Sequence, residues 1–176
     1  MHFARNLIAD ALTQLPNGVV KNVYYKSETT LPYKAQLDPQ NEYIVGVYDT
    51  DVAMENGLKF HVDWLRGQKT GFFVDQRENR SLLEHYATGR KVLNMFCYTG
   101  GFSFYALRGG AELVHSVDSS AKAISLTDAN VELNFPNCER HKSFAVDAFK
   151  YLDEMGSDYD LIVLDPPAFA KHKSAL

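Results

Sequence analysis

The spacing of hydrophobic positions changes partway along the chain, near residue 90. In the first part, apolar residues at helical spacing predict a helix over His2–Leu15, and runs rich in valine and tyrosine then predict short strands. These strands are expected at residues 19–26, 43–48, 52–55 and 59–64. Asn56-Gly57, between the last two, is a strong signal for a tight hairpin. Residues 1–70 are therefore expected to form a small, mostly antiparallel α+β module.

A connecting turn and helix are expected at residues 71–90. Asp75 is predicted to cap this helix, because Glu78 three residues later completes a capping-box pattern. Gly89 is the expected end of the helix, since glycine readily adopts the left-handed conformation that follows a last helical turn.

The part from Lys91 onward alternates short apolar runs with helical stretches. The runs predict strands at residues 91–96, 113–117, 144–146 and 161–164. The stretches between them predict helices that end near residues 108, 133 and 155. Strands that alternate with helices indicate a parallel sheet with right-handed crossovers. The chain is therefore expected to be α/β, with the α+β module preceding a parallel sheet at residues 91–176.

Polar positions recur where the predicted parallel strands end. Asp118, Asp147 and Asp165 each follow such a strand, and a turn containing Gly100-Gly101 follows the first one. In an open α/β sheet, ligands bind beyond the carboxyl ends of the strands. Asp118 lies 18 residues after Gly100, close to the spacing of about 20 expected for a carboxylate that binds ribose hydroxyls. A single such acid is commonly a helix cap, whereas three at equivalent places indicate a nucleoside-like ligand.

The glycine turn favours some cofactors over others. It lacks the third glycine of the dinucleotide fingerprint, and no Gly-Lys-Ser/Thr of a phosphate-binding loop follows it. A cofactor without a pyrophosphate, such as S-adenosylmethionine, suits a turn of this kind.

Composition and charge add three expectations. The chain has 176 residues, of which 45% are hydrophobic and 23% charged, with a net charge of −4, which is typical of a soluble globular protein. An RNA partner would therefore have to meet a local basic patch. No signal peptide, membrane-spanning run or metal-binding cluster is predicted, so Cys97 and Cys138 are expected to be reduced thiols in a cytoplasmic protein.

Three segments resemble motifs of the class I S-adenosylmethionine-dependent methyltransferases: NMFCYTGGFS, the strand end at Asp118, and LIVLDPPAFAK. The run ENGLKFHVDWLRGQKTGFFVDQRENR, from Glu55 to Arg80, is similar to the bacterial 23S ribosomal RNA cytosine-C5 methyltransferases. Those enzymes are built from a PUA domain, a small central domain and a Rossmann-like catalytic domain. The resemblance covers most of the chain from Tyr43 to Lys171. It implies that residues 91–176 are the first half of a Rossmann-like sheet.

The resemblance also implies roles for individual residues. Phe96, Tyr98, Thr99 and Gly100 would wrap the methionine and ribose parts of S-adenosylmethionine. Asp118 would hold the ribose hydroxyls and Asp147 the adenine amino group. Gln76 and Arg77 would close over the methionine end, although either one alone is also typical of a solvated first helical turn.

Asp165 and Phe169 are the residues expected to face the target base. Phe169 could stack on a flipped base or be part of the core, and Asp165 could hydrogen-bond or protonate the ring. Methylation at C5 of cytosine needs a nucleophile at C6. The family resemblance implies a cysteine beyond Leu176 for this step, because Cys97 fits better as a packing residue and Cys138 as a loop residue.

Several alternatives stay open at this point. The Asp165-Pro166-Pro167 turn also resembles the turn of base-nitrogen methyltransferases, and a non-catalytic module that binds RNA or cofactor is a further class. The chain is expected to be a fragment, because the PUA domain and the later strands of the related fold lie outside it. Ribosomal RNA is the expected partner, with a homodimer or association through the exposed fourth strand, at residues 161–164, as a second expectation.

Overall fold

The computed structural model describes residues 2–28, 37–47, 51–67, 69–156 and 158–167. The chain divides into two compact units. Unit 1 consists of Met1–Val52 and Val62–Phe73, and unit 2 of Ala53–His61 and Val74–Leu176. In sequence, the two segments of unit 1 are thus separated by a short segment that belongs to unit 2.

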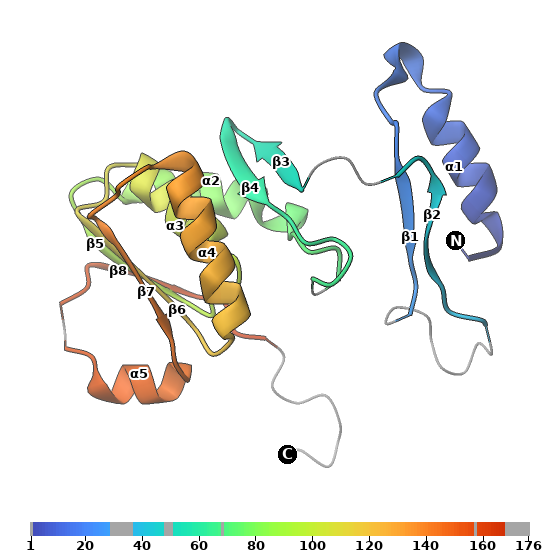
Figure 1. Ribbon diagram of the computed structural model, residues 1–176. Helices are drawn as coiled ribbons and strands as arrows, with labels where there is room; N and C mark the ends of the chain where they lie inside the picture. Colours follow the sequence, from blue (N-terminus) through green and yellow to red (C-terminus); the bar gives the residue numbers. More distant parts are fainter. Residues whose placement is uncertain (1, 29–36, 48–50, 68, 157, 168–176) are drawn as a thin grey trace. The chain divides into compact units, whose positions relative to one another are not determined.

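Unit 1 combines a helix with an antiparallel strand pair (Figure 1). Its elements are η1 (His2–Ala4), α1 (Arg5–Thr13), η2 (Pro16–Gly18), β1 (Val23–Lys26) and β2 (Asn41–Val45). Lys26 Nζ donates to the carbonyls of Trp64 and Gly67 at 2.8 and 2.7 Å. This side chain therefore fastens the second segment of unit 1 to the end of β1.

Unit 2 is built on the parallel sheet that the sequence predicts. Its strands lie in the order β7-β6-β5-β8, so the first and last strands along the chain are neighbours in the sheet. Helices α2, α3 and α4 lie on one side of the sheet and α5 on the other (Figure 1). The bounds are α2 (Arg77–Tyr86), β5 (Lys91–Met95), α3 (Gly101–Arg108), β6 (Leu113–Asp118), α4 (Ala121–Asn134), β7 (His141–Ala145), α5 (Ala148–Glu154) and β8 (Leu161–Leu164).

The hairpin β3 (Val52–Glu55) and β4 (Leu58–His61) does not follow the boundary expected at residue 70. Its turn forms as predicted, with positive φ at Asn56 (49°) and Gly57 (83°). The hairpin nevertheless packs within unit 2, because Leu58 and Phe60 are buried and Phe60 contacts the ring of Phe104 in α3. The sequence predicted the antiparallel hairpin, but it did not predict the unit against which the hairpin packs.

The predicted capping box at the start of α2 is wrong. Asp75 lies in a 3₁₀ turn, η4 (Val74–Gln76), and the residue that caps α2 is Gln76, with no side-chain capping bond. Glu78 instead pairs with its neighbour Arg77 at 3.1 Å. Because of the 3₁₀ turn, the α-helix starts two residues beyond Asp75, so Asp75 does not occupy the N-cap position.

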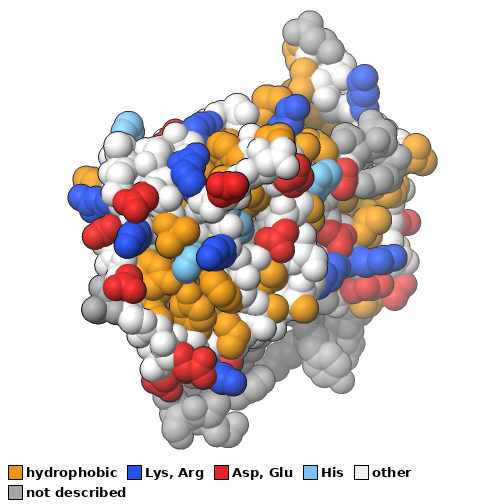
Figure 2. Space-filling model, turned by 60° about the vertical axis from the view of Figure 1, so that its left-hand side comes forward, with side chains coloured by type: hydrophobic (Ala, Val, Ile, Leu, Met, Phe, Trp, Pro, Cys, Tyr) orange, Lys and Arg blue, Asp and Glu red, His pale blue; other side chains and the backbone are white. Residues whose placement is uncertain are grey.

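Strand β8 lies at one edge of the sheet that the described residues form. Ile162 is 47% exposed and Leu164 63% exposed. Figure 2 shows hydrophobic side chains gathered on one face, with charged side chains around them. An apolar edge strand with unpaired backbone groups readily recruits another chain.

Residues 1–176 produced alone are therefore expected to self-associate at tens of micromolar, which sedimentation velocity measures directly. Ile162→Lys and Leu164→Lys place charges on the edge strand and should shift the distribution toward monomer. Leu82→Lys, at an exposed position of α2, serves as the control for added charge. A monodisperse monomer of the unchanged sequence would contradict this prediction.

Candidate cofactor site

The turn after β5 has an unusual backbone. Phe96, Tyr98 and Gly100 all have positive φ, at 54°, 50° and 81°. For the two aromatic residues this left-handed conformation costs on the order of 1–3 kcal/mol each. Backbone N–H groups in turns of alternating handedness converge, and such concave turns bind polar or anionic groups. The strain therefore marks residues 96–100 as a candidate site.

Backbone and carboxylate bonds hold this turn against the end of β6. The N–H of Cys97 donates to the carbonyl of Val117 at 3.0 Å, and the N–H of Gly100 donates to the carbonyl of Cys97 at 2.8 Å. The N–H of Tyr98 donates to Asp118 Oδ2 at 2.9 Å. Two bonds therefore tie the turn to the end of β6, and one closes the turn on itself.

Asp118 is fixed from both sides. In addition to the bond from Tyr98, its Oδ1 accepts from the N–H of Ser120 at 2.9 Å, just before α4 begins. Ser120 itself caps α4 by accepting from the N–H of Ala123. A carboxylate oxygen can accept more than one hydrogen bond, so both oxygens keep capacity for the hydroxyls of a ligand. The chain thus presents a carboxylate of fixed orientation beside the strained turn.

Helix α4 holds the carbonyl groups of the same turn. Thr127 Oγ1 donates to the carbonyl of Tyr98 at 3.0 Å, and Asn130 Nδ2 donates to the carbonyl of Thr99 at 3.4 Å. Both side chains are fully buried. Sequence reasoning did not assign a role to either residue. The available signal is a polar stripe on the inner face of α4, since Thr127, Asn130 and Asn134 recur at helical spacing.

Cys97 is a packing residue, as the sequence indicated. Its side chain is buried, and burial raises the pKa of the thiol to about 12, with the negative charge of Asp118 adding to the effect. The thiol is therefore protonated at neutral pH and cannot act as a nucleophile. Cys138 is partly buried in the loop after α4.

Asp147 and Asp165 follow β7 and β8 at the same edge of the sheet, because all four strands are parallel. Asp147 caps α5 by accepting from the N–H groups of Phe149 and Lys150 at 3.0 and 3.1 Å. Asp165 is exposed directly after β8. Phe169 lies outside the described residues, and so do the side-chain contacts predicted for it.

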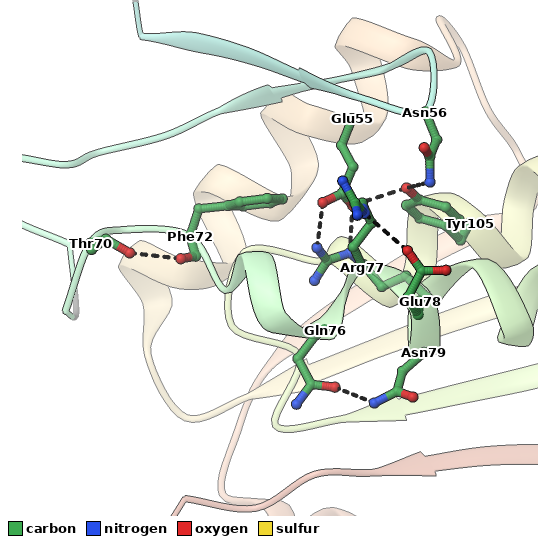
Figure 3. A network of polar contacts seen from close by, with 10 residues as sticks. Glu55, Asn56, Thr70, Phe72, Gln76, Arg77, Glu78, Asn79 and Tyr105 are labelled. Atoms are coloured by element: carbon green, nitrogen blue, oxygen red, sulfur yellow. Dashed lines mark hydrogen bonds and ion pairs between the residues drawn. The ribbon is translucent and has the colours of Figure 1, made fainter. Parts of the chain in front are cut away.

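Gln76 and Arg77 lie at the start of α2. Gln76 Oε1 accepts from Asn79 at 2.8 Å, and Arg77 pairs with Glu78 (Figure 3). Both interactions are local to the first helical turn, as they are in a solvated helix start. The predicted contact of these two residues with a cofactor stays a prediction.

Two absences concern only the part of the chain that the structure describes. It contains no group of three or more His, Cys, Asp or Glu residues placed to hold a metal ion. Within the same residues, no helix is long and apolar enough to cross a membrane.

Comparison with known proteins gives a consistent result. The family model described as S-adenosylmethionine-dependent methyltransferase matches residues 10–176. A protein of Aeromonas hydrophila named ribosomal RNA large subunit methyltransferase I is 42% identical over 99% of this chain, which spans only 45% of that protein. The chain thus spans about half the length of the curated relatives it matches.

Solved structures agree with the family model. A methyltransferase complexed with SAH has a TM-score of 0.77 and is 31% identical, over 98% of this chain and 44% of that one. An S-adenosylmethionine-dependent methyltransferase of Agrobacterium tumefaciens has a TM-score of 0.72 and 26% identity, over 92% of this chain and 50% of that one. The chain therefore belongs to the S-adenosylmethionine-dependent methyltransferase family.

Proposed function

We propose that this chain provides the cofactor site of an enzyme that methylates C5 of a cytosine in large-subunit (23S) ribosomal RNA. The observation that carries the proposal is the fixed Asp118 carboxylate beside the left-handed turn at residues 96–100. The name of the Aeromonas relative supports ribosomal RNA as the substrate. S-adenosylmethionine is the methyl donor that the family uses.

Different residues of this chain bind different parts of the cofactor. Asp118 binds the ribose hydroxyls, and the turn at Phe96, Tyr98, Thr99 and Gly100 encloses the ribose and methionine parts. The N-terminal N–H groups of α3, which have no partners within the helix, favour a polar or negatively charged group at the same place. Asp147, after β7, accepts from the adenine amino group. Gln76 and Arg77 close over the methionine end.

The chemistry at C5 limits which residues take part. C5 of cytosine becomes nucleophilic only after a nucleophile adds to C6, and the C5 proton leaves after the methyl group has transferred. Cys97 is excluded as that nucleophile because its thiol is buried and protonated. We assign the step to a cysteine elsewhere in the protein, beyond residue 176. Asp165 and Phe169 face the base, with Asp165 hydrogen-bonded to the ring.

A base-nitrogen methyltransferase is the second candidate. Asp165, Pro166 and Pro167 are exposed at the end of β8, next to the strand that precedes the cofactor turn. An Asp-Pro-Pro turn at this place could polarise an exocyclic amino group, and such a reaction needs no cysteine. The two candidates give different products, so product analysis separates them.

The test uses the full protein, unmodified large-subunit ribosomal RNA and methyl-labelled S-adenosylmethionine. Nucleosides released by digestion are identified by mass spectrometry. 5-Methylcytidine is the expected product, and Cys97→Ser should still form it because this thiol takes no part in the chemistry. An N-methylated nucleoside would establish the second candidate, and absence of any transfer would favour a non-catalytic binding module.

Asp118→Ala is expected to weaken binding of S-adenosylhomocysteine (SAH) by about 1.5–3 kcal/mol, because a charge-assisted bond to the ribose is lost. The loss corresponds to roughly 10- to 150-fold in dissociation constant, measured by calorimetry. Asp153→Ala, at an exposed position of α5, is the matched control and should bind SAH as the unchanged protein does. Equal affinity in the Asp118 variant would show that this carboxylate does not hold the ribose.

A further inference from the structure

A nearly dry ion pair joins the β3–β4 hairpin to helix α2. Arg80 donates to Glu55 through two parallel bonds, Nε to Oε1 at 2.9 Å and Nη2 to Oε2 at 2.8 Å. The two side chains are only 4% and 9% exposed. Removing two charges from water costs about as much as their attraction returns, so a buried pair is weak evidence for a role in stability. Its geometry points instead to a role in position.

The stem of Arg80 lies against the end of the cofactor turn. A Cβ added to Gly101 would be 3.2 Å from Arg80 Cδ and 3.8 Å from Nε and Nη1. Gly101 begins α3 and directly follows Gly100. The absence of a side chain at residue 101 therefore lets the arginine stem support the backbone where the turn passes into the helix.

A second contact reaches Glu55 from α3 itself. Tyr105, one helical turn after Gly101, donates its hydroxyl to Glu55 Oε1 at 2.9 Å and accepts from Asn56 Nδ2 at 3.0 Å. Figure 3 shows Glu55, Asn56 and Tyr105 converging at the tip of the hairpin. The hairpin tip is therefore bonded to both helices that flank the turn.

The other strand of the hairpin is linked to the turn through α4. The N–H of His61 in β4 donates to Asn130 Oδ1 at 2.6 Å. The amide nitrogen of the same side chain donates to the carbonyl of Thr99 at 3.4 Å. Asn130 has no exposed surface, so one buried amide bridges the hairpin and the turn.

We propose that the β3–β4 hairpin is part of the cofactor apparatus, and that Arg80 and Asn130 are positioning residues that hold the turn at residues 96–101 in its binding conformation. The inference rests on the proposed function, since it concerns the cofactor site proposed above. It extends that site to the β3–β4 hairpin, which lies outside the parallel sheet. In sequence, the hairpin is the short segment of unit 2 that lies between the two segments of unit 1.

The chain offers two matched controls. Arg108 and Glu84 form an equally bidentate pair between α3 and α2, with both bonds at 2.7 Å. Arg108 also donates to the carbonyl of Asn56 in the hairpin, but the pair has no contact to the turn among the described interactions. Asn134 donates to and accepts from the backbone of Lys59 in β4, one helical turn beyond Asn130. It binds the hairpin as Asn130 does, but it does not bind the turn.

The experiment compares Arg80→Lys and Asn130→Ala with Arg108→Lys and Asn134→Ala in the full protein. The first readout is the rate at which a thiol reagent labels Cys97, followed by peptide mass spectrometry, with Cys138 as the internal reference. Cys97 lies inside the turn and is buried, so its labelling reports loosening of the turn without any ligand. The second readout is the dissociation constant of SAH. All measurements are made well below each variant's unfolding temperature, and Glu55→Gln is a milder break of the ion pair if Arg80→Lys does not fold.

We expect Arg80→Lys and Asn130→Ala to raise both the labelling rate and the dissociation constant by at least about tenfold, and the controls to change either by less than about twofold. Unchanged values in the first two variants would overturn the proposal, and so would equal changes in the controls. If the unchanged protein does not bind SAH, the proposed function fails, while the Cys97 labelling still decides whether the hairpin positions the turn.

Discussion

Gly100→Ala is expected to lower the free energy of unfolding of unit 2 by about 3 kcal/mol and to abolish measurable binding of SAH. Gly100 has a φ of 81°, a conformation that costs an alanine roughly 1–2 kcal/mol. A Cβ there would also be 2.6 Å from Thr127 Cγ2 and 2.8 Å from the ring of Phe104. Both neighbours are fully buried, so neither can move aside without disturbing the core.

Gly89→Ala separates the two contributions. Gly89 also has a positive φ, 68°, but no atom lies within 4 Å of an added Cβ. This variant should therefore show only the conformational cost of about 1–2 kcal/mol and should keep its affinity for SAH. Urea unfolding followed by circular dichroism gives the stabilities, and calorimetry gives the affinities. If the two variants lose equal stability, or if Gly100→Ala still binds SAH, close packing around the turn is not what shapes the site.

The sequence predicted best those elements whose signals are local. Leu161–Leu164 and Val52–Glu55 have in the structure the bounds predicted for them, because turn or charged residues follow each short run. Asn56-Gly57 forms its hairpin because both residues tolerate positive φ. The carboxyl-end position of Asp118 follows from the alternation of strands and helices alone.

Two predictions failed, one for a local reason and one because of a tertiary contact. The capping box at Asp75 is absent because the chain enters α2 through a 3₁₀ turn. The hairpin belongs to unit 2 because Glu55 forms an ion pair there with Arg80, 25 residues further along the chain. Periodicity shows which faces are apolar, but it does not show which surfaces meet.

The same limit applies to the candidate site. Glycine spacing and the Asp118 strand end located the turn, but the strain at Phe96 and Tyr98 has no sequence signal, since aromatic residues seldom adopt positive φ. The supports of the turn, Thr127 and Asn130, also lie in an element distant in sequence. A buried amide or hydroxyl on a helix reveals its partner only when the neighbouring backbone is known.

A row of hydrogen-bonded polar side chains crosses the sheet beneath α3 and ends at His141. Asn94 Nδ2 donates to Ser103 Oγ at 2.9 Å, Ser103 and Ser116 share a hydrogen bond at 2.6 Å, and Ser116 Oγ lies 2.8 Å from His141 Nε2. Every hydrogen bond in this row can form when Ser116 donates to the unprotonated Nε2 of His141. A proton on Nε2 of His141 would set two donors against each other at Ser116, so protonation would force this buried row to rearrange and would also bury a charge.

The stability of unit 2 is therefore expected to fall as the pH drops from 7 to 4. Burial lowers the pKa of His141 from 6.5 to about 4, with Asp128 opposing the shift and His115 adding to it. Because the folded state holds the neutral imidazole, the unfolded state binds more protons below pH 6.5. The stabilisation is complete above that pH and is lost as the pH falls through 4. It amounts to about 2–3 kcal/mol.

His141→Gln tests this dependence, because the glutamine amide can bond to Ser116 but does not titrate. Urea unfolding at pH 7.5 and pH 4.5, followed by circular dichroism, should show that the variant loses about 2 kcal/mol less stability between the two values than the unchanged protein. Hydrogen exchange of the β6 amides assigns the transition to unit 2. The same substitution at the exposed His85 controls for the loss of an imidazole. An identical pH dependence in the His141 variant and the unchanged protein would show that His141 is not kept neutral by the fold, and that acid acts on unit 2 through other groups.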